Sequence, residues 1–150
     1  MTEKTTTAAA TAASSPAAPG RGREATDRVT VRMPAEGAYL SVLRTATAGL
    51  AARLDFTLDE IEDLRIAVDE ACAMLLNQAI PGSDLECSFA LGRNEMTISV
   101  SVPSLAPTPP ASDTFAWTVL SALAGNVDSF TGPGDQLTIV MQKSRLSGSA

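Results

Sequence analysis

The sequence predicts an α+β fold, built as a two-layer α/β sandwich in which helices gather on one face of a mixed sheet. Five short segments alternate apolar and polar residues, which is typical of half-buried strands. Three longer segments repeat apolar residues every three or four positions, which is typical of amphipathic helices. The order along the chain is strand, two helices, two strands, helix, two strands.

The first strand and the first helix follow one another closely. Residues 28–33 alternate and are rich in β-branched side chains, so we expect a strand there. A helix follows Gly37 and ends near Leu54, before the turn at Asp55. Its inward stripe is Tyr39, Leu43, Leu50 and Leu54, with Thr47 between them.

The second helix begins with a capping box, Thr57-Leu-Asp-Glu60. In this motif the hydroxyl and the carboxylate each satisfy a free backbone N–H at the start of the helix. The helix runs to about Ala79, where Pro81-Gly82 stops it. Its buried face is Ile61, Leu64, Val68, Ala71, Cys72 and Leu75.

The second half of the chain holds a hairpin, a Pro-rich loop, a short helix and two closing strands. These segments span 84–91, 95–102, 103–112, 113–124, 127–131 and 136–143. The hairpin turns at Gly92-Arg-Asn94, and Gly132-Pro-Gly-Asp135 joins the last two strands. The residues of the short helix that point inward are Phe115, Val119, Leu120 and Leu123.

Both ends of the chain are predicted to lie outside the folded domain, which spans 27–144. Residues 1–26 are rich in Ala, Thr, Ser and Pro, which predicts a disordered tail, and 145–150 form a second tail. The N-terminal segment lacks the apolar core of a signal peptide, and prolines interrupt the uncharged run over 96–111. We therefore expect a cytoplasmic protein with no membrane partner.

Composition excludes several classes of function. The chain of 150 residues carries 11 Lys and Arg against 17 Asp and Glu, a net charge of −6. Nucleic acid binding needs clustered basic residues, so we expect no direct nucleic acid partner, whereas a basic protein partner suits the acidic surface. The absence of histidine excludes Ser-His-Asp and Cys-His catalysis and the common zinc sites. Cys72 and Cys87 match no metal or disulfide spacing, so we interpret them as reduced core thiols and predict no metal site.

The second helix carries a motif that is typical of a known family. Leu64-Arg-Ile-Ala-Val-Asp-Glu-Ala-Cys72 resembles the start of a characteristic helix in the anti-sigma serine kinases of bacterial partner-switching systems. These belong to the gyrase, Hsp90, histidine kinase and MutL ATPase superfamily. Asp69-Glu-Ala-Cys72, Phe115-Ala-Trp117 and Leu120-Ser-Ala-Leu-Ala124 resemble the divergent actinobacterial anti-sigma factors of the mycobacterial sigma-F type. The resemblance covers 28–143 and implies the histidine-kinase/Hsp90-like ATPase (Bergerat-type) fold.

In active members of this family, the helix carries a catalytic Glu and, four residues later, an Asn that holds Mg²⁺ against the nucleotide phosphates. The resemblance places Glu70 at the catalytic and nucleotide-binding position, but Met74 at the Asn position. A thioether is a poor ligand for Mg²⁺. Asn77 lies two turns from Glu70 on the same side and is the alternative nucleotide-binding contact. The competing interpretation of Glu70 is a solvated acid beside Asp69.

The other two nucleotide motifs of the family are also replaced. The turn that recognises adenine through an Asp, followed by two glycines, corresponds to Val102, Ser104 and Ala106. The Gly-x-Gly segment that opens the next helix toward the phosphates lies within Thr114-Phe-Ala-Trp117. We interpret Phe115 and Trp117 there as core residues, with occlusion of the old site as the alternative. Because three parts are altered, no cofactor is predicted and Mg-ATP is disfavoured.

One partner-binding residue is carried over from the family. Its first helix presents an Arg that contacts both the sigma factor and the anti-anti-sigma factor, and Arg44 falls on that position. Arg44 lies off the Leu stripe, among the small residues Ser41, Ala48 and Ala51. An Arg that projects from small neighbours suits a partner carboxylate, and the alternative is an ordinary surface arginine.

The residues and the resemblance together predict an anti-sigma factor. We expect it to sequester an alternative sigma factor and to be countered by an anti-anti-sigma factor. The alternative is an active ATP- or GTP-dependent serine kinase of the same family, with Glu70 as base and Asn77 as metal contact. A structural module without a sigma partner is a third hypothesis. The resemblance also leaves open a homodimer that pairs through the sheet.

Overall fold

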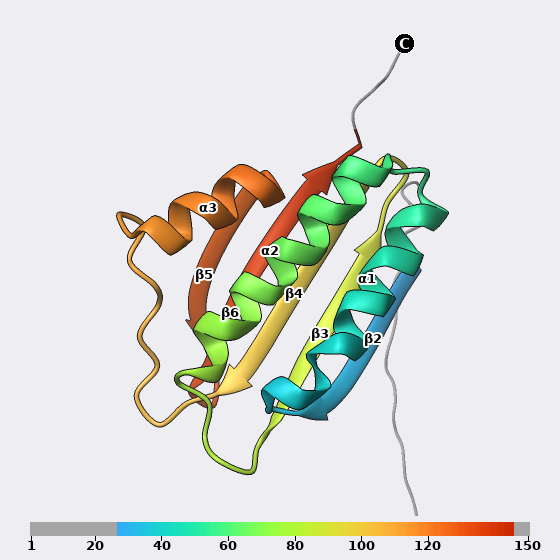
Figure 1. Ribbon diagram of the computed structural model, residues 1–150. Coiled ribbons are helices and arrows are strands. Elements are labelled where there is room, and N and C mark those ends of the chain that lie inside the picture. Colours follow the sequence, from blue (N-terminus) through green and yellow to red (C-terminus); the bar gives the residue numbers. More distant parts are fainter. Residues whose placement is uncertain (1–26, 146–150) are drawn as a thin grey trace, which may run out of the picture.

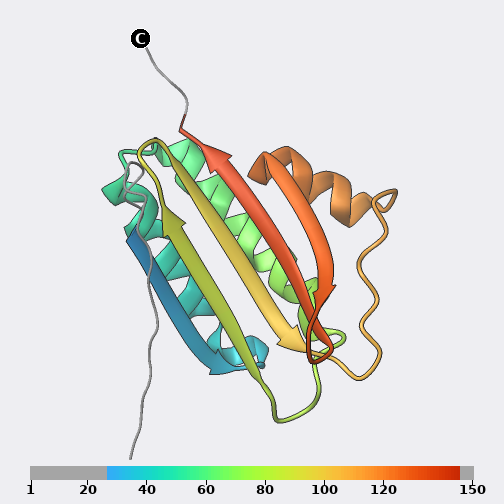
Figure 2. The same cartoon turned by 180° about the vertical axis from the view of Figure 1, so that it is seen from behind.

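The computed structural model describes residues 27–145, which form two layers (Figure 1). Three α-helices lie together on one face of a five-stranded sheet. Seen from behind, the opposite face of the sheet carries no helix of the described residues (Figure 2). The predicted two-layer α/β sandwich is therefore confirmed. The predicted N-terminal tail, 1–26, lies outside the described residues, as do 146–150.

The elements follow the predicted order. The strands are β2 (Asp27–Pro34), β3 (Asp84–Leu91), β4 (Glu95–Pro103), β5 (Asn126–Gly132) and β6 (Gln136–Ser144). The helices are the 3-10 helix η3 (Gly37–Tyr39), then α1 (Leu40–Arg53), α2 (Leu58–Leu76) and α3 (Phe115–Ala124). The largest difference in bounds is at the end of α2, which stops at Leu76 and does not reach Ala79.

The sheet has the order β2-β3-β4-β6-β5, and every neighbouring pair is antiparallel. The prediction of a mixed sheet is therefore wrong. The reason is the pair of helices between β2 and β3. Because α1 leads the chain back along the sheet and α2 returns it, β3 starts where β2 ended and runs in the opposite direction (Figure 1). A single helix in that connection would have made the two strands parallel.

The core lies between the sheet and the helices. Alternate residues of β3 and β4 face the helices and are buried, and the register pairs Phe89 with Ile98. The predicted inner face of α2 is confirmed. Leu64, Val68, Ala71, Cys72 and Leu75 are fully buried, and Ile61 is partly buried against them. The capping box is confirmed too, because Thr57 Oγ1 accepts the Glu60 N–H at 3.1 Å and Glu60 Oε1 accepts the Thr57 N–H at 2.8 Å.

Three predictions of side-chain orientation are wrong. Tyr39 is 42% exposed because it belongs to the 3-10 helix, whose tighter turn does not continue the stripe of α1. Phe115 is 83% exposed because it is the first residue of α3, where the helix projects past the edge of the sheet (Figure 1). Ala51, predicted beside Arg44 on the outer face, is buried in the core. Leu120 is buried as predicted.

Two hydrogen bonds join the residue after β6 to the β3–β4 turn. Arg145, which the sequence assigned to the C-terminal tail, donates its backbone N–H to the Asn94 carbonyl at 2.7 Å. Its Nη2 donates to Asn94 Oδ1 at 2.8 Å. In the part of the chain that the structure describes, no helix has both the length and the apolar character needed to cross a membrane.

Candidate functional site

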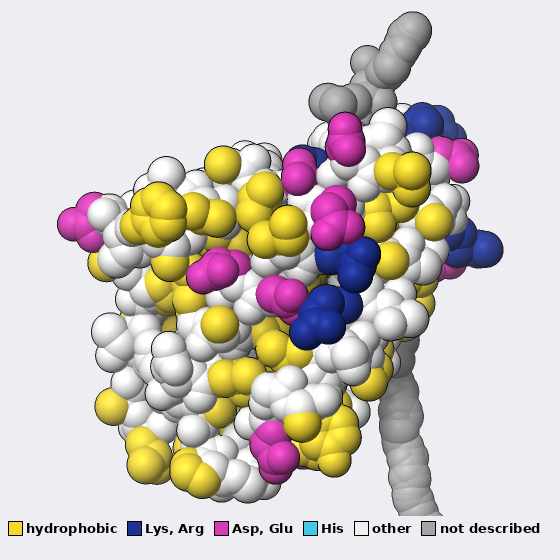
Figure 3. All heavy atoms as spheres, viewed as in Figure 1, with side chains coloured by type: hydrophobic (Ala, Val, Ile, Leu, Met, Phe, Trp, Pro, Cys, Tyr) yellow, Lys and Arg dark blue, Asp and Glu magenta, His cyan; other side chains and the backbone are white. Residues whose placement is uncertain are grey.

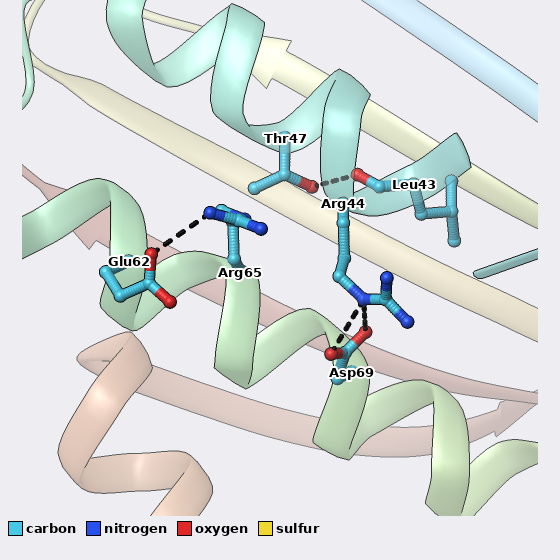
Figure 4. Close-up of polar contacts among 6 residues, drawn as sticks. All are labelled: Leu43, Arg44, Thr47, Glu62, Arg65 and Asp69. Carbon is cyan, nitrogen blue, oxygen red and sulfur yellow. Dashed lines mark hydrogen bonds and ion pairs between the residues drawn. The ribbon is translucent and has the colours of Figure 1, made fainter. Parts of the chain in front are cut away.

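Arg44 of α1 reaches across to Asp69 of α2 (Figure 4). The Nε of Arg44 lies 2.9 Å from each oxygen of the Asp69 carboxylate. The two side chains are 38% and 39% exposed. The pair therefore joins the two helices at the surface while both groups stay open to solvent.

A second arginine, Arg65 of α2, lies beside this pair (Figure 4). Its Nη1 donates to Glu62 Oε1, one turn earlier on α2, at 3.1 Å. Arg44 and Arg65 line a shallow depression of about 400 Å³ between the helices, here named the α1–α2 depression. Its other lining residues are Thr45, Ala48 and Gly49. Because these three are small and uncharged, the two guanidinium groups determine the charge of the lining.

The surroundings of the α1–α2 depression are acidic. Basic side chains gather over the junction of α1 and α2, and acidic side chains lie around them (Figure 3). The lining of the depression therefore carries two guanidinium groups, each paired with a carboxylate, on a chain whose net charge is −6. Thr47, on the inner side of α1, adds nothing to it, since its buried hydroxyl donates to the Leu43 carbonyl at 2.7 Å (Figure 4).

The structure separates the predicted partner-binding residues. Arg44 and Ala48 line the depression, whereas Ser41 is exposed on α1 outside its lining. Arg65 and Asp69 were not predicted from the sequence as residues of this site. Their four-residue spacing places both on one face of α2, so part of the signal was present in the sequence. The pairing with Arg44 also depends on how α1 packs against α2, which no local pattern contains.

The structure places the three residues of the predicted nucleotide site on α2, Glu70, Met74 and Asn77, in different surroundings. Glu70 is half-buried, and its side chain has no hydrogen bond to a described residue. Met74 packs against the core. Asn77 is the C-cap of α2 and is exposed, beyond the last helical turn. Among the residues that the structure describes, no group of three His, Cys, Asp or Glu side chains could hold a metal ion.

The residues at the adenine positions do not fit the base either. Val102 is fully buried and apolar, so it offers no acceptor to an amino group. Ser104 is buried, and its backbone N–H donates to the Asp135 carbonyl at 3.0 Å. Ala106 is exposed in the loop that follows.

At the start of α3, a side chain of the helix's own N-cap accepts a backbone N–H of the first turn. Thr114 is the N-cap, and its Oγ1 accepts the Trp117 N–H at 3.2 Å. The Trp117 ring is half-buried against the core, so its core interpretation is confirmed, whereas that of Phe115 is wrong. In active members of the family, backbone N–H groups at this position bind a phosphate. Here the N–H of Trp117 already donates to Thr114. The residues at all three motifs therefore do not fit Mg-ATP in the manner of the active family. We refer to Glu70, Met74, Asn77 and 114–117 as the α2–α3 region.

Two hydrogen bonds join the loop between β4 and α3 to the segment that follows α2. Gln78 donates its Nε2 to the Thr108 carbonyl at 2.7 Å and accepts the Thr108 N–H on its Oε1 at 2.9 Å. Sequence analysis missed this contact because it extended α2 to Ala79. Since the helix ends at Leu76, Gln78 is free to reach the loop.

The two cysteines are buried thiols, as predicted. Burial, and secondarily the Asp69 carboxylate, raises the pKa of Cys72 from 9.0 to about 12. Burial, and secondarily the neighbouring Cys72, raises the pKa of Cys87 as well. Both therefore keep their protons at neutral pH, which makes them poor nucleophiles.

Comparison with known proteins identifies relatives of the chain. The anti-sigma-F factor RsbW of Mycobacterium tuberculosis is 32% identical over 113 residues, which cover 75% of this chain and 67% of that protein. The chain belongs to the RsbW family. The serine-protein kinases RsbW of Bacillus cereus and Bacillus anthracis are 30% identical over 76 residues, 51% of this chain and 48% of theirs. No family model matches the chain.

A solved structure agrees with this RsbW assignment at the level of the fold. The RsbU and RsbW domains of a Mycobacterium tuberculosis protein match with a TM-score of 0.59 and 14% identity, over 79% of this chain and 32% of that one. The histidine-kinase/Hsp90-like ATPase fold implied by the sequence is thereby confirmed. The RsbW relatives carry two different names, anti-sigma factor and serine-protein kinase. Family membership alone therefore does not decide between the two activities.

Proposed function

We propose that this RsbW-family protein is an anti-sigma factor that sequesters an alternative sigma factor and acts without a kinase reaction. The observation that carries the proposal is a contrast along α2: the Arg44–Asp69 pair is exposed for docking, while Met74 is packed where the family needs a metal ligand. The mycobacterial relative is named an anti-sigma-F factor, which supports the same class of partner. The proposal places the protein in the cytoplasm, with its target.

We expect the sigma factor to be released when an anti-anti-sigma factor competes for the same surface. A sigma factor and an anti-anti-sigma factor that both need the surface around Arg44 exclude each other, so a rise in one frees the other by mass action. The acidic charge of the chain speeds the approach of a basic partner surface. Pairing of two copies through the helix-free face of the sheet stays a prediction, which sedimentation of the purified chain would check.

Co-purification tests the proposal. The tagged full-length chain is recovered from cells of its own organism, and bound proteins are identified by mass spectrometry, with and without Mg-ATP. We expect an alternative sigma factor in both samples, and repression of the matching promoter when the chain is added to a transcription reaction. A chain that retains no sigma factor and represses no promoter contradicts the proposal.

The competing function is a serine kinase that phosphorylates the anti-anti-sigma factor. It is favoured by the retained Glu70 as base and by the naming of the Bacillus relatives as serine-protein kinases. In that case Asn77 would replace the missing metal ligand. Calorimetric titration with Mg-ATP separates the two functions: we expect no heat at millimolar nucleotide, whereas saturable binding together with a phosphorylated partner would establish the kinase. A chain with neither partner nor nucleotide would be a structural module.

A further inference from the structure

The α1–α2 depression brings two guanidinium groups together in a chain that has more acidic than basic residues. Arg44 comes from α1 and Arg65 from α2, and both side chains lie in the space between the helices (Figure 4). Two positive groups that face the same space repel each other unless anions compensate them. Asp69 and Glu62 compensate these charges as ion pairs, but each carboxylate occupies only some of the N–H donors of its guanidinium.

Both guanidinium groups keep donors for a further anion. A guanidinium has five N–H donors. Arg44 uses its Nε for Asp69, and its two Nη atoms have no hydrogen bond to a described residue. Arg65 uses one Nη for Glu62. The remaining donors suit the two oxygens of a carboxylate, which planar N–H pairs bind well.

Gly49 leaves one part of the lining of the depression without a side chain. It lies in the interior of α1, where glycine weakens a helix relative to alanine. A Cβ at this position would meet no atom within 4 Å, so packing within the chain does not require glycine. A residue without a side chain in the lining leaves room for a group that comes from outside.

We infer that Arg65 is a second partner-binding residue, which together with Arg44 binds one aspartate or glutamate side chain of the protein partner in the α1–α2 depression. The inference rests on the proposed docking function of Arg44. Because acidic side chains lie around the site, the partner's carboxylate must sit in a surface that is otherwise neutral or basic (Figure 3). A uniformly acidic partner would be repelled.

Titration of the full chain with the sigma factor that it retains tests this inference. Arg65→Gln is expected to weaken the affinity about tenfold. Arg93→Gln is the matched control, since it removes the same charge from an exposed residue of the β3–β4 turn, and we expect a change of less than about twofold. The double variant Arg44→Gln, Arg65→Gln should lose less than the product of the two single losses, because both act on one carboxylate.

These outcomes separate the inference from the proposed function. If Arg65→Gln binds like Arg93→Gln while Arg44→Gln is weakened, the inference is overturned and the proposed function stands. If the loss of affinity in the double variant equals the product of the two single losses, the two arginines do not bind one shared carboxylate, and the inference is overturned. A wild-type chain that binds no sigma factor overturns both the inference and the proposed function.

A second variant tests whether a group enters the depression. Gly49→Leu places a side chain in the lining, and we expect about tenfold weaker binding. The midpoint of thermal unfolding should stay at or above that of the wild type, because leucine favours the helix over glycine. Gly49→Ala is the control, with a raised midpoint and a smaller loss of affinity. Wild-type affinity in Gly49→Leu overturns the inference.

Discussion

The α1–α2 depression and the α2–α3 region both include residues of α2, and they use their polar groups differently. In the depression, Arg44 and Arg65 keep N–H donors that no described residue accepts. In the α2–α3 region, Met74 and Trp117 pack against the core, and Thr114 caps its own helix. The first region keeps hydrogen-bond donors that a partner could use, whereas in the second the side chains of Met74 and Trp117 and the N-cap of α3 are held by contacts within the chain.

The difference shows which kind of site a fold can lose and which it can keep. Exposed donors cost little when no partner is bound, since water replaces the missing acceptor. A nucleotide pocket is different, because it leaves an open space and backbone groups that the chain itself does not satisfy. Apolar packing that fills such a space adds stability once the chemistry is no longer needed. We therefore expect substitutions in the depression to change binding, and substitutions around α3 to change folding.

The largest expected effect is on folding, at Leu120 of α3. Leu120 is fully buried, so Leu120→Ala removes apolar contacts and leaves a cavity. We expect a loss of about 2–5 kcal/mol in the free energy of unfolding, measured by urea denaturation. Phe115→Ala on the same helix is the control, because its side chain is 83% exposed, and its effect should stay within about 0.5 kcal/mol. Equal losses would mean that α3 is not anchored by its inner face.

The second effect is a loss of stability at high pH, caused by the two buried thiols, Cys72 and Cys87. Cys72 is held protonated up to a pKa of about 12 in the folded chain, whereas the unfolded thiol ionises near 9.0. Above pH 9 the unfolded state therefore binds fewer protons, and stability falls as pH rises. At pH 10 we expect a loss of roughly 1 kcal/mol from Cys72, and the raised pKa of Cys87 acts in the same direction. Urea denaturation between pH 8 and pH 10 measures this fall in the free energy of unfolding.

The double variant Cys72→Ala, Cys87→Ala isolates this contribution, because it removes both thiols and leaves every other titrating group in place. We expect its stability to change less between these pH values than that of the wild type. An unchanged slope would mean that the two thiols are not protected from ionisation in the folded chain.

The fold could be read from the sequence because its signals are local. The capping box at Thr57 and the alternation in β3 and β4 each involve residues close in the chain, and both are confirmed. The errors lie where an element meets its surroundings. The orientation of Phe115 depends on where α3 extends past the sheet, and the antiparallel pairing of β2 with β3 depends on the path through two helices.

The candidate site was predictable only in part, for the same reason. Arg44 was found from the resemblance, but its bond to Asp69 joins residues that lie on different helices. The contribution of Arg65 to the depression depends likewise on the packing of α1 against α2. Gln78 was missed because its reach to the loop requires α2 to end early. Side-chain pairing between elements needs the assembled fold.

A smaller effect separates binding from folding at Arg44. Arg44→Ala should weaken the complex with the sigma factor by about 1–3 kcal/mol if Arg44 is a central contact. The free energy of unfolding should fall by no more than about 1 kcal/mol, since both side chains of the pair with Asp69 are more than one third exposed. Arg32→Ala is the control, because Arg32 forms a more exposed ion pair with Asp84 on the sheet, and it should leave the complex unchanged. Wild-type affinity in Arg44→Ala would reject the docking role.

The smallest expected effect is the most informative for the α2–α3 region. Met74→Asn restores the metal ligand of the active family beside Glu70, and we expect calorimetry with Mg-ATP to show no binding heat at millimolar nucleotide. The reason is that Val102 stays buried and apolar at the adenine position, and the N–H of Trp117 stays bonded to Thr114. Met74→Leu, which keeps the packing without adding a ligand, is the control. Saturable binding in Met74→Asn alone would show that a single side chain separates this chain from the nucleotide-binding members of its family, and the contrast between the two regions would then reduce to one residue.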